Sequence, residues 1–371
     1  MLGIGEIVHE VLNRNRRRNI IKPLDGPLSP NTALDSAPVV INGVEEPNDL
    51  MISSSGASYV CAGNRILRYD GADFSSPGIA AEFPGEVTAV TEHPQGGLLA
   101  CVAGSGLHFV GGPRAGEIVV AAGGEPLKCL TDVAVRQNGD IFVTDGSRQY
   151  PPTDWVVDLM EKGRSGRLVR IDSAGSAAVL LDGLAFAHGV CLAHNQKTAL
   201  VTESWKHRIL AVEVRATSPN ATATPVPELD NLPAYPARLC RTDFGYALAL
   251  FAMRTQLVDF ILDGEDAFRK DMIRRVPKQF WAAPQLYAPG HFLDPVQGGG
   301  LKKHGAVNAW APPRSYGLVV LLDRDFTIID SFHSRVGGAC HGVTGVASTR
   351  GVVYAVSKGC SKVVAISPEI Q

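Results

Sequence analysis

The chain has 371 residues, of which 45% are hydrophobic and 19% charged, so it can bury a sizeable core and cannot be a disordered tail. Its 35 Lys and Arg against 37 Asp and Glu leave a formal charge of −2, so nothing attracts it as a whole to nucleic acid or an anionic membrane. The 39 Gly and 24 Pro indicate many turns between short strands. Composition therefore favours an all-β protein without a nucleic-acid partner.

The first 20 residues predict one short amphipathic helix. Apolar residues recur at helical spacing from Leu2 to Leu12, and three consecutive arginines begin at Arg16. We expect this helix to pack on the body of the protein, with a membrane-surface or partner anchor as the alternative. Residues 22–44, with Pro23, Pro27 and Pro30, predict an extended lead-in without its own core, so 1–44 form one N-terminal segment.

Neither a secretory signal nor a membrane span is predicted. Residues 1–12 lack the apolar core that a cleavable signal requires, and no stretch approaches the roughly 18 continuous apolar residues of a spanning helix. The seven cysteines are spread along the chain without a C-x-x-C pair, mostly in apolar runs, which is typical of reduced, buried thiols. We therefore expect a cytoplasmic protein.

From about residue 45, one pattern recurs six times: a short apolar strand, a turn with Gly or Asn, a second strand and an outer strand. Most repeats begin roughly 40 to 57 residues apart, which matches the length of a propeller blade. The openings are PNDLMIS at 47, EVTAVTEHP at 86, LTDVAVRQNG at 130, AHGVCLAHNQ at 187, YPARLC at 235 and HGVTGV at 341. Residues 45–371 are therefore predicted to form an all-β, six-bladed β-propeller.

The last two openings are about twice as far apart, so an insertion of about residues 263–313 precedes the last blade. It starts with a predicted helix, DGEDAFRKDMIRRV, and continues as an irregular, aromatic segment. Its aromatic content favours either a lid over the propeller mouth or a contact between two copies in a homodimer. Its residues His291, His304 and Trp310 are candidates for substrate contact.

The innermost strand of each propeller blade lines a central tunnel, so residues at the starts of these strands converge. This rule brings together a polar set: Asn48, Asp132, His188, Arg238, Cys340 and His341. The imidazoles of His188 and His341 suit acid–base catalysis near neutral pH, with Asp132 beside them. Arg238 is expected to bind a substrate carboxylate or oxyanion, or to form an ion pair with Asp132. Asn48 and Cys340 are expected to contact the substrate.

Three segments of the chain resemble the strictosidine-synthase-like family in order and spacing. They are LTDVAVRQNGDIFVTDGSRQYPPTDWVVDLMEKGRSGRLVRID, VLLDGLAFAHGVCLAHNQKTALVTESWKHRIL and DNLPAYPARL. The resemblance covers roughly residues 45–370 and is strongest over 127–260. It implies a six-bladed β-propeller related to paraoxonases and gluconolactonases.

The resemblance also implies a cofactor, because calcium-dependent relatives hold a divalent cation in the tunnel with Glu, Asn and Asp side chains. Asn48 falls on the Glu of their G-P-E-D motif, His188 on the Asn of F-A-N-G-V and Ala237 on the Asp of Y-P-D-N, whereas Asp132 keeps its carboxylate. The implied metal ligands are therefore Asn48, Asp132 and His188. An imidazole among them favours a softer metal or metal-free acid–base chemistry.

Together these features predict a hydrolase, lactonase-like or esterase-like, for a small lactone, ester or related carbonyl substrate at the tunnel mouth. His188 and His341 would activate water, and Arg238 or a metal held by Asn48 and Asp132 would stabilise the oxyanion. Two alternatives stay open: a metal-free lyase or condensing enzyme of the strictosidine-synthase-like type, and a non-enzymatic ligand-binding propeller. No G-x-G-x-x-G pattern follows a strand, so neither a nucleotide nor a flavin is expected.

Overall fold

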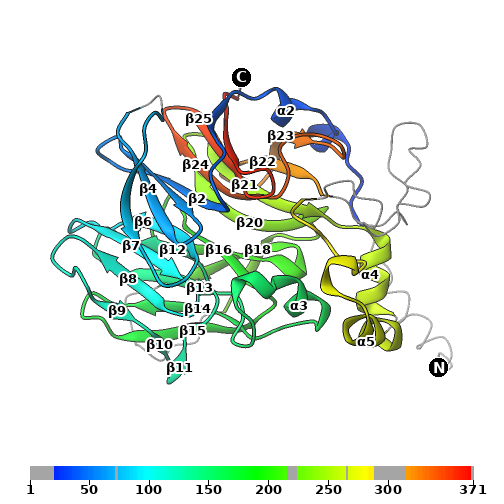
Figure 1. Cartoon of the computed structure of the whole chain (residues 1–371), viewed down its shortest axis with the longest axis horizontal. Helices are drawn as coiled ribbons and strands as arrows, with labels where there is room; N and C mark the ends of the chain where they lie inside the picture. Colours follow the sequence, from blue (N-terminus) through cyan, green and yellow to red (C-terminus); the bar gives the residue numbers. More distant parts are fainter. Residues whose placement is uncertain (1–20, 72–73, 215–223, 265, 288–314, 369–371) are drawn as a thin grey trace.

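The computed structural model describes residues 21–71, 74–214, 224–264, 266–287 and 315–368. The predicted N-terminal helix lies outside these residues, as do His291, His304 and Trp310. Within the described part of the chain, six four-stranded antiparallel sheets surround a common centre (Figure 1). This arrangement confirms the predicted six-bladed β-propeller.

Each sheet runs in chain order from an innermost to an outermost strand, except the last. The first is β2 (Pro47–Ile52), β3 (Ser58–Ala62), β4 (Arg65–Tyr69) and β5 (Gly78–Glu82); the second is β6 (Val87–Glu92), β7 (Leu98–Val102), β8 (Gly106–Val110) and β9 (Ile118–Val119). The third is β12 (Leu130–Val135), β13 (Ile141–Asp145), β14 (Gly166–Ile171) and β15 (Ala177–Leu184); the fourth is β16 (Ala187–Leu192), β17 (Thr198–Glu203), β18 (Arg208–Glu213) and β19 (Val226–Leu229). The fifth is β20 (Ala234–Arg241), β21 (Gly245–Met253), β22 (Gly317–Asp323) and β23 (Ile328–Ser334).

The sixth sheet closes the ring by joining the two ends of the propeller. It is β24 (Val343–Thr349), β25 (Val352–Ser357), β26 (Lys362–Ile366) and β1 (Val39–Asn42), and β1 pairs with β26 at Val39↔Val364. The extended lead-in thus supplies the outermost strand of the last blade. Because the first and last segments of the propeller share one hydrogen-bonded ladder, this pairing holds the ring closed.

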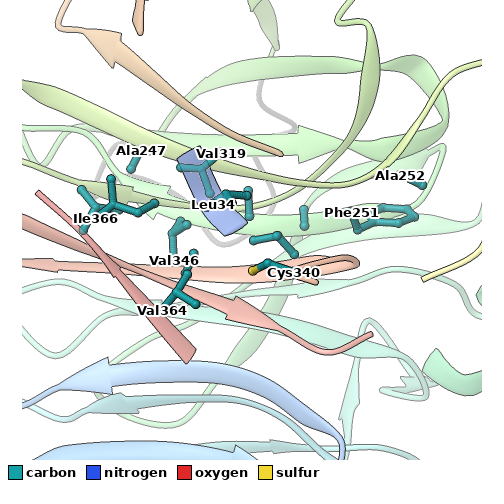
Figure 2. Packing of buried hydrophobic residues seen from close by; sticks show 14 of the residues in the cluster. Leu34, Ala247, Phe251, Ala252, Val319, Cys340, Val346, Val364 and Ile366 are labelled. Atoms are coloured by element: carbon teal, nitrogen blue, oxygen red, sulfur yellow. The ribbon is translucent and has the colours of Figure 1, made fainter. Parts of the chain in front are cut away.

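The six innermost strands pack against one another around the tunnel in the order β2, β6, β12, β16, β20 and β24, and β24 returns to β2. All six overlap the openings that the repeat pattern predicts, and their first residues differ from the predicted ones by at most two positions. Buried apolar residues fill the wedges between neighbouring blades. Figure 2 shows one such wedge, in which Leu34, Phe251, Cys340 and Val346 belong to one buried cluster. Leu34 comes from the short helix α2 (Ala33–Ser36), so the lead-in also covers this core.

The insertion lies before the last blade in the chain, as predicted, and its position is inside the fifth sheet, between β21 and β22. It contains α4 (Gln256–Asp263), α5 (Asp266–Arg275) and the 3-10 turn η4 (Lys278–Phe280), and α5 confirms the predicted helix. A second insertion between β13 and β14 carries η2 (Pro152–Asp154) and α3 (Trp155–Met160), and α5 contacts α3 beside the propeller (Figure 1).

The remaining described elements are short. The 3-10 turn η1 (Gly26–Leu28) lies in the lead-in, and η3 (Ser204–Lys206) lies between β17 and β18 of the fourth blade. The strands β10 (Ala121–Ala122) and β11 (Glu125–Pro126) connect the second blade to the third. Of the helices in the described ranges, none is both long and apolar enough to cross a lipid bilayer.

Candidate functional site

A pocket of about 330 Å³ opens at the end of the tunnel where the innermost strands begin, and we name it the rim pocket. Every innermost strand contributes one residue to it: Asn48, Thr88, Thr131, His188, Arg238 and Thr344. In five of the six strands this residue is the second of the strand. The predicted convergence of strand starts is therefore what builds the pocket.

One side of the rim pocket is aromatic. Trp155 of α3, Phe186 and Phe251 line it together with Leu286, which follows the helices of the insertion. The rings pack edge to face or tilted, with centroids 5.3 Å apart for Trp155 and Phe251 and 5.7 Å apart for Phe186 and His188. Such a surface binds the apolar body of a ligand and leaves its polar groups to the other side.

The other side carries three hydrogen-bonded polar side chains, Asn48, Glu86 and Lys358, which we name the charged wall. Nζ of Lys358 lies 2.5 Å from Oε1 of Glu86 and 2.7 Å from Oδ1 of Asn48. Nδ2 of Asn48 donates to the same Glu86 oxygen at 2.8 Å, so each member contacts the other two. The Lys358 and Glu86 side chains are 22% and 11% exposed, which fixes an ion pair in a largely dehydrated setting.

The electrostatics of the charged wall keep Glu86 ionised. Burial acts to raise the pKa of Glu86, but the Lys358 ammonium and the hydrogen bonds from Lys358 and Asn48 outweigh it and hold the pKa below its usual value. Among the described residues, Oε2 of Glu86 is buried and has no hydrogen-bond partner. A buried, unpartnered carboxylate oxygen at a pocket is a site for a donor on a ligand or a water.

The sequence analysis missed Glu86 and Lys358. Glu86 stands immediately before β6, and Lys358 stands immediately after β25, the second strand of its blade. Because β25 runs antiparallel to β24, its end returns to the rim at which β24 starts. Applying the convergence rule to the ends of second strands as well as to the starts of first strands would have found Lys358.

His188 lies in the rim pocket, as the sequence predicts. Its ring packs against Phe186 and Phe251, and its Nδ1 lies 3.5 Å from Oγ of Ser204. Burial lowers the pKa of His188 well below its ordinary value, and the positive charges of Arg238 and Lys358 lower it further, so the imidazole is neutral at neutral pH. A neutral imidazole accepts a proton or a hydrogen bond from water.

The position of His188 depends on the glycine that follows it. A Cβ atom on Gly189 would lie 2.7 Å from the Ala237 carbonyl oxygen and 2.8 Å from Cα of Arg238, both on the neighbouring strand β20. Only glycine permits this approach of two innermost strands. The H-G-V sequence is thus partly a packing requirement of the tunnel.

The side chain of Arg238 points across the tunnel and bonds to the protein itself. Its two terminal nitrogens donate to four backbone carbonyl oxygens, and Nε lies 3.6 Å from Oδ1 of Asp132 and 3.9 Å from Oδ1 of Asp49. Of the two roles expected for Arg238, an ion pair with Asp132 is the one that this geometry contains. The terminal N–H groups of Arg238 already donate to these carbonyl oxygens, so they are not free to bind a substrate oxyanion.

Asp132 does not line the rim pocket. It lines a second pocket of about 340 Å³, at the opposite end of the tunnel, which we name the far pocket. Its Oδ1 accepts from the Val133 amide at 2.9 Å and its Oδ2 from the Val190 amide at 2.8 Å. Burial, only partly opposed by Arg238, raises the pKa of Asp132 to about 7. The structure therefore separates Asp132 from His188 by the Arg238 side chain, which lines both pockets.

His341 and Cys340 also lie away from the rim pocket. Nδ1 of His341 bonds to Oγ of Ser315 at 2.8 Å and Nε2 to the Arg335 carbonyl oxygen at 3.0 Å, so both ring nitrogens are engaged. Cys340 is 1% exposed in the cluster of Figure 2, and burial raises the pKa of its thiol to about 12.

The physical reason is the strand boundary. Strand β24 begins at Val343, so Thr344 takes the pocket position that the sequence analysis gave to Cys340 and His341.

The predicted metal ligands, Asn48, Asp132 and His188, do not fit a calcium ion. Both ends of the Asn48 amide are bonded within the charged wall, and Asp132 faces the far pocket. The backbone carbonyl oxygens that converge in the tunnel surround the Arg238 guanidinium. Within the described ranges, no group of three or more His, Cys, Asp and Glu side chains is arranged to hold a metal ion.

Comparison with known proteins agrees with the resemblance seen in the sequence. The strictosidine synthase family model matches residues 131–215. The adipocyte plasma membrane-associated protein of Salmo salar is 32% identical over 181 residues, 45% of this chain and 42% of that protein. The strictosidine synthase-like 10 protein of Arabidopsis thaliana is 29% identical over 177 residues, 46% of each chain. The matches thus span less than half the length of these curated relatives.

Solved structures show the same fold at low identity. A gluconolactonase from Xanthomonas campestris has a TM-score of 0.56 and 11% identity, with 88% of this chain and 87% of that chain covered. The calcium-binding protein regucalcin from Agrobacterium tumefaciens has a TM-score of 0.55 and 10% identity, with 89% and 92% covered. At these identities the likeness shows the fold alone. Over residues 131–215 the chain is therefore similar to the strictosidine synthase family, and its six-bladed fold is shared with gluconolactonases and regucalcin.

Proposed function

We propose that the chain is a hydrolase that acts on a small lactone, ester or related carbonyl compound bound in the rim pocket. The observation that carries this proposal is the charged wall, which holds an ammonium group in the same pocket as the neutral imidazole of His188. The opposing aromatic side chains accommodate the apolar body of the substrate. The gluconolactonase with the same fold is consistent with this reaction class.

The roles of the side chains follow from their hydrogen bonds. Lys358 uses two of its three donors on Glu86 and Asn48, so one remains to polarise the substrate carbonyl and stabilise the oxyanion. His188 accepts a proton from the attacking water and returns it to the leaving alkoxide as the carbon–oxygen bond breaks. The unpartnered Oε2 of Glu86 accepts a hydrogen bond from a hydroxyl group of the substrate. Lys358 thus replaces Arg238 in the role that the sequence analysis expected.

The direct test is turnover of a panel of small lactones and aryl esters by the full chain and its variants. We expect His188→Ala to lower kcat about 100-fold or more and Lys358→Met to lower it by a similar factor. Matched controls are His194→Gln and Lys197→Met, since both side chains are exposed on the loop after β16. Unchanged turnover in both pocket variants would contradict the assignment.

A metal-free lyase or condensing enzyme is the second candidate. The family-model match favours it, and so does the unpartnered carboxylate oxygen of Glu86, which suits an amine or hydroxyl donor. Reaction in ¹⁸O-labelled water separates the two candidates. Hydrolysis places the label in the carboxylate product, whereas a lyase or condensation product stays unlabelled. Saturable binding of a panel compound without turnover would instead favour a ligand-binding propeller.

A further inference from the structure

Among the described residues, Arg238 is the only charged side chain whose hydrogen bonds connect most of the blades. It extends from β20 of the fifth blade and is 4% exposed. Its terminal nitrogens donate to the backbone carbonyl oxygens of four other innermost strands, in the first, second, third and sixth blades: Asn48, Thr88, Thr131 and Thr344. A guanidinium can donate in several directions within one plane, so a single side chain satisfies all four oxygens.

Two carboxylates complete the surroundings of this guanidinium. Oδ1 of Asp49 and Oδ1 of Asp132 approach Nε of Arg238 from the first and third blades. Both carboxylates are tied to the neighbouring blade, since the other oxygen of Asp49 accepts from the Val90 amide at 3.2 Å and that of Asp132 from the Val190 amide at 2.8 Å. Six oxygen atoms held by the fold therefore surround one cation.

The carbonyl oxygens are held by a second set of hydrogen bonds. Oγ1 of Thr88 donates to the Leu130 carbonyl at 2.7 Å, and Oγ1 of Thr131 donates to the Ala187 carbonyl at 2.8 Å. These threonine hydroxyls link neighbouring blades and leave their own carbonyls directed at Arg238. The oxygen cage is therefore built into the blade interfaces and does not depend on the guanidinium alone.

We propose that the Arg238 guanidinium stands in the place of a tunnel cation, and that shortening this side chain uncovers a calcium site made of the four carbonyl and two carboxylate oxygens. Six is the lower end of the six to eight oxygen ligands that calcium takes. The guanidinium is itself a cation with several donors, so in this proposal the native chain joins its blades without a metal ion. This proposal does not depend on the hydrolase assignment.

The test compares thermal unfolding of Arg238→Ala, Arg238→Lys and the unaltered chain, each with chelator, with millimolar calcium and with millimolar magnesium. We expect the unaltered chain to respond to none of these additions. Arg238→Ala should lose roughly 10 °C of unfolding midpoint in chelator, because buried carboxylates lose their partner, and regain most of it in calcium. Magnesium should restore less, since it requires a smaller, octahedral site.

Two further variants locate the effect. Arg241→Ala, at an exposed position of the same strand, should respond to calcium no more than the unaltered chain does. The double variant Arg238→Ala, Asp132→Asn should lose most of the calcium response, because one of the two carboxylates is gone. Calcium titration by calorimetry should show one site in Arg238→Ala and none at that affinity in the unaltered chain.

Three results would overturn the proposal. The first is stoichiometric calcium in the purified unaltered chain, or a lower midpoint when it is chelated. The second is a folded Arg238→Ala variant that binds no calcium. The third is an Arg238→Ala variant that is insoluble with and without calcium in the medium while Arg238→Lys is soluble, since this would show that the cage needs a cation but that calcium cannot serve.

Discussion

The charged wall allows a quantitative prediction, because its two ions are paired in a setting with little water. Nζ of Lys358 and Oε1 of Glu86 lie 2.5 Å apart. At an effective dielectric constant of about 20, two unit charges at this separation attract by roughly 7 kcal/mol, and most of this is offset by the loss of hydration of both ions. Removing one ion leaves the other dehydrated and unpaired.

We therefore expect the double variant to cost less than the sum of the two single variants. Lys358→Met should lower the free energy of unfolding by about 2 to 4 kcal/mol, because the Glu86 carboxylate is left with only Asn48. Glu86→Gln should cost about 1 to 2 kcal/mol, since Lys358 keeps Asn48 and an amide oxygen. The double variant should cost about 2 kcal/mol less than the sum of the two.

Urea unfolding of the four proteins at neutral pH measures this coupling. The same measurement in high salt should give a similar coupling, because buried pairs are screened much less than exposed ones. Costs that add to within about 0.5 kcal/mol would refute the reasoning. In that case the ion pair would be solvated, Lys358 would not be held in place for a substrate carbonyl, and the proposed hydrolase would lose its oxyanion donor.

Three further predictions concern other parts of the propeller. Arg167→Met should destabilise the protein by about 3 to 5 kcal/mol in urea unfolding, because it leaves the Asp145 carboxylate buried and unpaired; a cost below about 1 kcal/mol would contradict the ion pair. Burial, with Arg335 nearby, lowers the pKa of His333 from 6.5 to about 4. Between these two pKa values the unfolded chain binds more protons than the folded chain, so the free energy of unfolding decreases as the pH decreases. We expect the free energy of unfolding to lose about 2 kcal/mol from His333 between roughly pH 7.5 and pH 5, a loss that His333→Gln should not show. Gly189→Ala should displace His188, so we expect turnover to fall sharply while the unfolding midpoint falls only slightly. Normal turnover would mean that the close approach to β20 is relieved at no cost.

The six innermost strands could be predicted from the sequence because each is a short apolar run followed by a turn at a regular interval. The strand that closes the ring could not. Val39–Asn42 is only four residues long and lies in a proline-rich segment, and its partner β26 is more than 300 residues away along the chain. A pairing this distant leaves no local pattern, since it depends on the completed ring.

The candidate site was predictable where the local strand start was visible. Asn48 and His188 are the second residues of their strands, and both line the rim pocket. In the second H-G-V sequence only the valine, Val343, belongs to β24, so the same three letters place His341 before the strand and outside the pocket. A shift of three residues relative to the strand start thus decides whether a side chain reaches the tunnel.

The direction of Arg238 could not be inferred from its position in the sequence. It is the fifth residue of β20, and the pairing of β20 with β21 shifts register between Pro236 and Leu239. An irregular register changes which face of a strand a side chain occupies. Only the assembled ring shows that four carbonyls from other blades meet at the end of this side chain.

The charges along the tunnel also restrict the kind of substrate. In the rim pocket, the charge of Glu86 is balanced by Lys358, and His188 is neutral. Below it, Arg238 faces Asp49 and Asp132, and burial raises the pKa of Asp132 to about 7.

Glu46 also lines the pocket, but it is exposed to solvent. Near neutral pH the buried part of the pocket therefore pairs its charges internally, and a charged ligand would enter it without a partner, at the high cost of an unpaired buried ion. A neutral compound with a polarised carbonyl avoids this cost and can still accept a hydrogen bond from Lys358. As pH rises above about 7, ionisation of Asp132 adds negative charge below the pocket, so we expect a cationic analogue to bind more tightly at high pH while a neutral lactone shows no such change. Equal pH dependence for both ligands would show that the guanidinium shields the pocket from Asp132.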